Sequence, residues 1–68
     1  MKTLDALIVH LKETGVLRLR RIEHALREVD RADFVPDNLR SETYEDTALP
    51  IGGGQTISQP YTVVFMLE

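Results

Sequence analysis

The spacing of apolar residues predicts two helices in the first half of the chain. The first stripe consists of Leu4, Leu7, Ile8 and Leu11. This i, i+3, i+4, i+7 pattern is typical of an amphipathic helix, which we expect over about residues 3–14, capped by Thr3 and closed by Gly15. A second stripe is formed by Leu19, Ile22, Leu26 and Val29. It predicts a helix over about residues 17–30 that packs its apolar face against the first helix.

After Asp30 the helical spacing is lost. Pro36 fixes its own φ and favours an extended conformation for the residue before it, so "ADFVPDNL" is predicted to be rich in turns. Phe34 and Val35 are the large apolar residues of this segment, and we expect both to enter the core beside the helices.

The last third of the chain contains the remaining predicted elements. A short β-hairpin is expected around Ala48 to Ile57, and Pro60 suits the first turn of a final helix over about residues 60–68. Ser58 or Gln59 is the expected cap of that helix. The predicted fold class is therefore mainly α, with two to three short helices and a short β-hairpin.

Composition narrows the class of protein further. The chain has 68 residues, of which 43% are hydrophobic and 28% are charged, so a single domain with a thin core is expected. No cysteine is present, which excludes disulfide frameworks and thiolate zinc sites and agrees with a cytoplasmic location. The net charge of −3 provides no general attraction to nucleic acid or to an anionic membrane. The opening "MKTLDALIVHLKETG" resembles neither a signal peptide nor a membrane span.

Other charged residues give weaker signals. The arginines Arg18, Arg20, Arg21, Arg27 and Arg31 lie in or beside the second predicted helix. Acidic residues interrupt them, and Arg27 follows Glu23 by four positions, so a solvated, salt-bridged face is a better interpretation than a DNA-reading helix. His10 and His24 stand alone, and no metal site is predicted.

The glycine triplet at residues 52–54 is the most unusual feature, because ordering glycine is costly in backbone entropy. It does not complete a dinucleotide-binding motif, since Ile57 stands where the last glycine is needed, and a P-loop would need a Gly-Lys pair. Two interpretations remain. The loop has a positive-φ backbone that admits a close ligand beside the start of a helix, which favours anions, or it is a plain turn followed by a capping Ser58.

Two longer stretches resemble a known family. "ALREVDRADFVP" and "YEDTALPIGGGQTISQPY" are similar to the amino-terminal segment of the protein-L-isoaspartate O-methyltransferases, and the stretch from Tyr44 to Pro60 is the most specific. The resemblance implies transfer of a methyl group from S-adenosylmethionine to the free α-carboxyl of L-isoaspartyl residues in damaged proteins and peptides. It also implies that these residues belong to a larger α/β, Rossmann-like methyltransferase.

The resemblance assigns roles to individual residues. Residues 52–58 correspond to the active-site loop, with Gln55, Thr56, Ile57 and Ser58 beside the cofactor and Ser58 in the catalytic position. A methyl transfer requires the nucleophile and the methyl carbon to be held in line, so positioning supplies much of the rate. Ser58 is accordingly expected to orient the substrate carboxylate as a hydrogen-bond donor, without acting as a nucleophile.

Length is where the chain departs from the family pattern. The Rossmann-like domain would follow Glu68, so we expect residues 1–68 to be inactive alone and to bind S-adenosylmethionine poorly. The last helix lacks a stop signal, and Val63, Val64, Phe65 and Met66 are expected to need a cover. The alternative is a standalone helical interaction module that self-associates through this helix.

Overall fold

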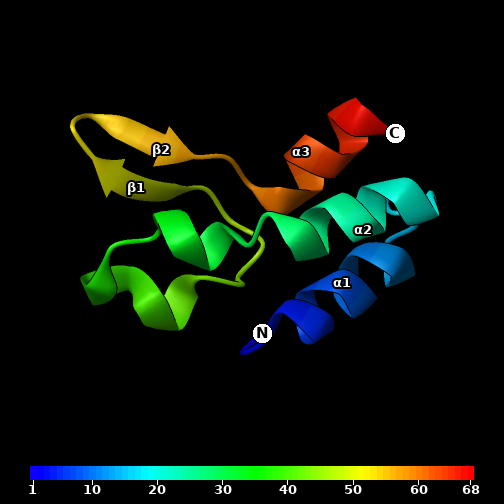
Figure 1. Ribbon diagram of the computed structural model, residues 1–68, viewed down its shortest axis with the longest axis horizontal. Coiled ribbons are helices and arrows are strands. Elements are labelled where there is room, and N and C mark those ends of the chain that lie inside the picture. The colour runs from blue at the N-terminus through cyan, green and yellow to red at the C-terminus, as the bar shows by residue number, and fades with distance from the viewer.

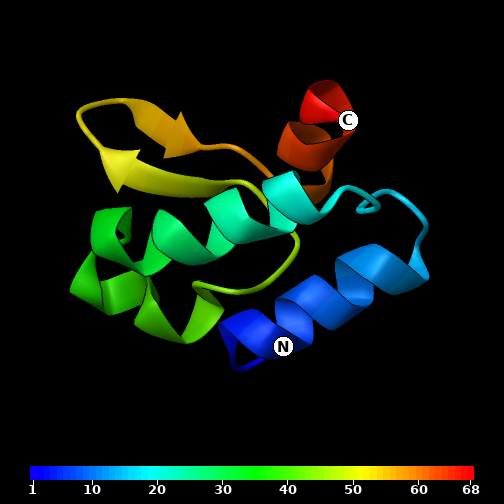
Figure 2. The same cartoon turned by 45° about the vertical axis from the view of Figure 1, so that its right-hand side comes forward.

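Helices form most of the structure, and a single β-hairpin projects from them. The computed structural model describes residues 1–68. Its elements in chain order are α1 (Leu4–Glu13), α2 (Arg20–Glu28), the 3-10 helices η1 (Arg31–Phe34) and η2 (Asp37–Glu42), strands β1 (Leu49–Gly52) and β2 (Gln55–Ile57), and α3 (Pro60–Leu67). In both views the hairpin lies over the green 3-10 helices at one end, and α3 lies at the other end with α1 and α2 (Figures 1 and 2). The predicted mainly helical class and the hairpin are confirmed.

Local sequence signals set the limits of α1. The Thr3 hydroxyl oxygen accepts a hydrogen bond from the backbone N–H of Ala6 at 3.1 Å, which satisfies one of the free amides of the first turn. At the other end Gly15 adopts a φ of 83° and donates its N–H to the carbonyl of Lys12 at 3.0 Å. Both predicted caps are confirmed.

Helix α2 begins later than its apolar stripe predicts. Val16 and Leu17 are buried but not helical, and Leu19 is still extended, with φ −85° and ψ 130°, so the helix begins at Arg20. The apolar side of α2 also packs less fully than expected, because Val29 is 65% exposed. The chain between α1 and α2 therefore follows a path that buries Val16 and Leu17 against α1, and these two residues do not join the helix.

The core lies between α1, the connection after it, and α3. Its six buried residues are Leu7, Ile8, Leu11, Val16, Leu17 and Val64. Ile22 and Leu26 of α2 pack on its edge, together with Tyr44 from the segment before the hairpin. The Glu68 side chain reaches back from α3 and accepts the backbone N–H groups of Arg18 and Leu19 at 3.2 and 3.0 Å. These contacts join the end of α3 to the connection between α1 and α2 around a small apolar centre.

One expected core position differs in the structure. Val35 is buried, but Phe34 is 55% exposed, so its prediction as a core residue is wrong. In α3, Val64 was expected to need a cover but is fully buried within the chain, while Phe65 and Met66 are exposed. None of the helices combines the length and the apolar character needed to cross a membrane.

Candidate active site

The hairpin that carries the predicted site is short and tightly turned. Its strands are antiparallel, with Leu49 opposite Ile57, and the register is irregular between Pro50 and Gly52. The three glycines of the turn, residues 52–54, have φ values of 99°, 61° and 75°. A side chain at any of them would meet no atom within 4 Å. The triplet is therefore required by backbone conformation and not by lack of space, which confirms the predicted positive-φ loop.

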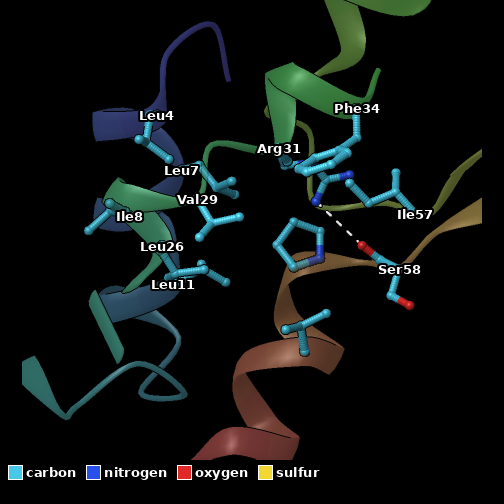
Figure 3. A pocket seen from close by; sticks show the side chains of 12 residues that line it. Leu4, Leu7, Ile8, Leu11, Leu26, Val29, Arg31, Phe34, Ile57 and Ser58 are labelled. Atoms are coloured by element: carbon cyan, nitrogen blue, oxygen red, sulfur yellow. Dashed lines mark hydrogen bonds between the residues drawn. The ribbon is translucent and has the colours of Figure 1, made fainter. Parts of the chain in front are cut away.

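The four residues with predicted site roles lie together at one strand and its exit. Gln55 and Thr56 are exposed on β2, Ile57 is half-buried, and Ser58 directly follows the strand. Ile57 and Ser58 line a hollow beside the core, whereas Gln55 and Thr56 do not. The Ser58 carbonyl faces Arg31, while its hydroxyl points away from the hollow (Figure 3). The hydroxyl is thus accessible from outside.

The hollow itself is mainly apolar and has a volume of about 210 Å³. It is lined by Leu4, Leu7, Ile8, Leu11, Leu26, Val29, Arg31, Phe34, Ile57, Ser58, Pro60 and Val63. These residues come from α1, α2, η1, the end of the hairpin and α3 (Figure 3). Val29 and Phe34 line this hollow and are partly exposed to solvent, so they lie at its rim. Its lining suits apolar groups and offers few hydrogen-bond partners.

The start of α3 is held by a carboxylate from another part of the chain. Asp46 accepts the backbone N–H of Tyr61 at 2.8 Å through Oδ1, and its Oδ2 lies 3.1 Å from His10 Nε2. Gln59 is the N-cap residue, as predicted, but its side chain accepts a hydrogen bond from the Thr62 hydroxyl at 3.4 Å and none from a backbone amide of the helix, so the expected side-chain capping is not present. Because Asp46 already supplies a negative charge and uses the first available amide, this helix start is not an open anion site.

A second polar cluster lies where α2 meets η1. The Tyr44 hydroxyl lies 2.8 Å from each carboxylate oxygen of Asp30 and donates its hydrogen to that group. Asp30 also accepts the backbone N–H of Ala32 at 3.0 Å and so caps η1. Burial raises the pKa of Tyr44 to about 12, and the hydrogen bond and charge of Asp30 act in the same direction. This cluster fixes the first turn of η1, to which Arg31 belongs.

Arg31 connects this cluster to the hairpin. Its Nη2 donates to the carbonyl of Thr47 at 3.2 Å, and its Nη1 donates to the carbonyl of Ser58 at 3.4 Å. Burial lowers the pKa of the guanidinium, and the charge of Asp46 opposes that shift. The Nε atom is buried without a hydrogen-bond partner. The prediction that Arg31 belongs to the solvated face is therefore wrong. The sequence signal that could have separated Arg31 from the other arginines is its place in "VDRADFVP", the end of the first stretch that carries the family resemblance.

The rest of the basic face agrees with the sequence interpretation. Arg27 Nε lies 3.4 Å from Glu23 and its guanidinium also pairs with Asp5 of α1, while Lys12 lies 2.6 Å from Glu23. The hydrogen bond from Lys12 is the main cause that lowers the pKa of Glu23. These exposed pairs confirm the predicted salt-bridged face and join α1 to α2, with a small effect on stability.

Comparison with known proteins matches almost the whole chain to a single protein family. Residues 2–68 match the family model of protein-L-isoaspartate(D-aspartate) O-methyltransferase. A protein-L-isoaspartate O-methyltransferase of Anaeromyxobacter dehalogenans is 58% identical over 52 residues, which cover 76% of this chain and 25% of that protein. Relatives with the same name from Roseiflexus sp. and Methanopyrus kandleri are 54% and 45% identical, cover 93% and 94% of this chain, and match over 28% of their own length. The chain spans roughly a quarter to a third of the length of such curated relatives, between 25% and 32%.

Proposed function

The chain belongs to the protein-L-isoaspartate(D-aspartate) O-methyltransferase family, and we propose that it forms the amino-terminal part of an enzyme that methylates isoaspartyl residues in damaged proteins. The observation that carries this proposal is the match over residues 2–68, which includes the hairpin and Ser58. In the proposed enzyme, the hairpin covers the reacting groups. The Ser58 hydroxyl, which faces outward from the end of β2, orients the substrate carboxylate (Figure 3).

The methyl donor that we propose is S-adenosylmethionine, and the residues of this chain do not form a complete site for it. The hollow beside Ile57 has about 210 Å³ and an apolar lining, whereas ligand pockets are typically roughly 300–1,000 Å³ with several placed polar groups. The ribose and amino-acid groups of the donor find no matching set of partners there. The contribution of Gln55, Thr56, Ile57 and Ser58 would therefore be at the edge of the bound donor.

The chemistry requires positioning more than acid or base catalysis. In the proposed reaction, an oxygen of the isoaspartyl α-carboxylate forms a bond to the transferred methyl carbon. The carbon–sulfur bond breaks at the same time, and its electron pair remains on sulfur. The carboxylate is already ionised at neutral pH, so no proton has to be removed. A hydroxyl such as that of Ser58 can hold one carboxylate oxygen while the other reacts. The backbone nitrogen of the following residue would then attack the ester carbon and lose its proton, and methanol would leave as the succinimide ring closes; hydrolysis of the succinimide partly restores a normal aspartyl residue.

The alternative of a standalone interaction module is not supported. The family match extends over residues 2–68 and gives no sign of a separate module. Phe65 and Met66 are exposed on α3, but Val64, which was expected to need a partner, is already buried in the chain itself.

A chimaeric enzyme tests the role of Ser58. In it, this chain replaces the matching amino-terminal part of the Roseiflexus relative, and methyl transfer to an isoaspartyl peptide is measured. A positioning hydrogen bond of about 1.4 kcal/mol corresponds to tenfold in rate, so we expect Ser58→Ala to lower kcat by about tenfold or more. The control is Ser41→Ala, which removes an exposed hydroxyl from η2 and should leave kcat unchanged.

Two results would count against the proposal. Full activity of the Ser58→Ala chimaera would refute the positioning role of Ser58. Isothermal titration of S-adenosylmethionine into the 68-residue chain should give no detectable heat of binding. Micromolar binding would mean that the chain builds a donor site by itself, contrary to the small apolar hollow described above.

A further inference from the structure

One side chain joins both ends of the hairpin to the helical part of the molecule. Thr47 stands just before β1 and Ser58 just after β2, and their carbonyls accept hydrogen bonds from the two terminal nitrogens of Arg31. Leu49 and Ile57 pair directly inside these two points. The guanidinium thus closes the base of the hairpin from outside, while the three positive-φ glycines form its tip.

The neighbouring residue Asp30 fixes the backbone that carries Arg31. The preceding Asp30 caps η1 through the N–H of Ala32 and receives the hydroxyl of Tyr44 on both oxygens. The backbone that carries Arg31 is therefore fixed by a local cap and by a contact from one distant segment of the chain. Its side chain crosses from η1 to the exit of the hairpin, where the dashed line reaches the Ser58 carbonyl (Figure 3).

The buried Nε atom indicates that this side chain is fixed by its terminal nitrogens. A buried donor without a partner costs roughly 1–3 kcal/mol, and such an atom in a native fold calls for an explanation. The two carbonyl contacts provide one, because they direct the guanidinium plane toward the hairpin and leave Nε facing the protein interior. Both acceptors are backbone atoms, so Arg31 acts on the path of the main chain.

We propose that Arg31 is a positioning residue that closes the base of the hairpin and, by holding the Ser58 carbonyl, sets the direction of the Ser58 hydroxyl. The inference rests on the proposed function of Ser58. The planar guanidinium presents two N–H groups in a fixed fork and can reach both carbonyls at once. A lysine at this position has a single ammonium on a flexible stem, which cannot hold the two carbonyls in the same fixed geometry.

The first test measures the hairpin in the 68-residue chain by amide hydrogen exchange. Loss of one of the two contacts should let the hairpin open more often, so Arg31→Lys is expected to speed exchange of the β1 and β2 amides by about tenfold, with α1 amides unchanged. Arg40→Lys is the matched control, because Arg40 is exposed and pairs only with nearby Asp37. Equal hairpin exchange in Arg31→Lys and in the original chain would refute the closure of the hairpin base.

The second test is a double-mutant cycle in the chimaeric enzyme. Arg31→Lys should lower kcat by about fivefold or more while changing KM for the methyl donor by less than about twofold, and Arg31→Met should behave alike. If Arg31 acts through Ser58, then Arg31→Lys added to Ser58→Ala should cause little further loss. Arg40→Lys is again the control and should retain full activity.

Each result has a distinct meaning. If Ser58→Ala is harmful but Arg31→Lys lowers kcat by the same factor with and without it, Arg31 does not act through Ser58 and the inference is wrong. A rise in KM for the peptide at constant kcat would make Arg31 a substrate contact, which also overturns it. A harmless Ser58→Ala would instead refute the proposed function, and the catalytic part of this inference with it, while hydrogen exchange would still decide the closure of the hairpin base.

Discussion

The contact between Tyr44 and Asp30 allows a prediction with a calculable size. Tyr44→Phe removes the hydroxyl and keeps the ring, so the loss reports mainly on the two 2.8 Å contacts with the carboxylate. A hydrogen bond to a charged group contributes roughly 1.5–3 kcal/mol, and partial exposure places this one near the lower end. We expect Tyr44→Phe to lower the free energy of unfolding by about 1.5 kcal/mol at pH 8.

The raised pKa of Tyr44 makes its contribution to stability depend on pH. Burial and Asp30 raise this pKa from 10.0 to about 12, so the folded state favours the protonated phenol. The stabilisation is complete below pH 10, falls as the pH rises from 10 toward 12, and is absent above that range. A shift of this size corresponds to roughly 2–3 kcal/mol before solvent screening, and screening at this half-buried site makes the pH-dependent contribution smaller.

Urea unfolding followed by circular dichroism, at several pH values from 8 to 11.5, measures this effect. The quantity of interest is the difference in unfolding free energy between the original chain and Tyr44→Phe, which should shrink as the pH rises. Tyr61→Phe is the matched control, because it keeps the ring that stacks on Phe65 and removes a hydroxyl outside the Asp30 cluster. A difference below about 0.5 kcal/mol at pH 8, or one that does not change with pH, would refute the reasoning.

Three further changes test the core, the hairpin turn and the start of α3. Leu11→Ala should lower the free energy of unfolding by about 2–5 kcal/mol, which is comparable with the total stability expected for a chain of this size. Circular dichroism of this variant should therefore show a largely unfolded protein, whereas Leu11→Met should remain folded. Gly53→Ala should lower the melting temperature, because φ 61° costs an alanine about 1–2 kcal/mol, and Gly53→Asn should cost less; equal melting temperatures for Gly53→Ala and the original chain would contradict this explanation. Asp46→Ala should destabilise the chain by about 1–2 kcal/mol in urea unfolding, and Asp46→Asn should recover part of that loss; if Asp46→Ala is as stable as the original chain, the carboxylate does not hold α3.

Features encoded by neighbouring residues could be predicted from the sequence. The cap at Thr3 and the turn at Gly15 depend on the chemistry of one residue and the helix next to it, and both are present in the structure. The glycine triplet likewise predicts a positive-φ turn, because other residues are strained there. The mainly helical class follows from apolar spacing, which is also a local pattern.

Features that depend on distant residues could not be predicted. The second helix was predicted to begin near residue 17, but Val16 and Leu17 enter the core with residues of α1 and α3, and the helix begins at Arg20. Ser58 had the right chemistry for a cap, yet Asp46 reaches the first turn of α3 from outside the local sequence. The roles of Gln55, Thr56, Ile57 and Ser58 came from resemblance to a family and stay predictions.

The two stretches that carry this resemblance contact each other in the structure, and this explains why a thin core is sufficient to place the hairpin. Asp30 of the first stretch accepts the hydroxyl hydrogen of Tyr44 of the second, and Arg31 beside it donates to backbone carbonyls at both ends of the hairpin. Asp46 then fixes the start of α3, close to where the chain leaves Ser58. An apolar contact limits distance but hardly direction, whereas a hydrogen bond also limits the angle between its groups. Polar contacts are therefore better suited than more apolar burial to direct a single hydroxyl. The hydrogen bonds of the "VDR" and "YED" sequences thus hold the backbone on both sides of the hairpin, which is the arrangement that the proposed positioning of Ser58 requires.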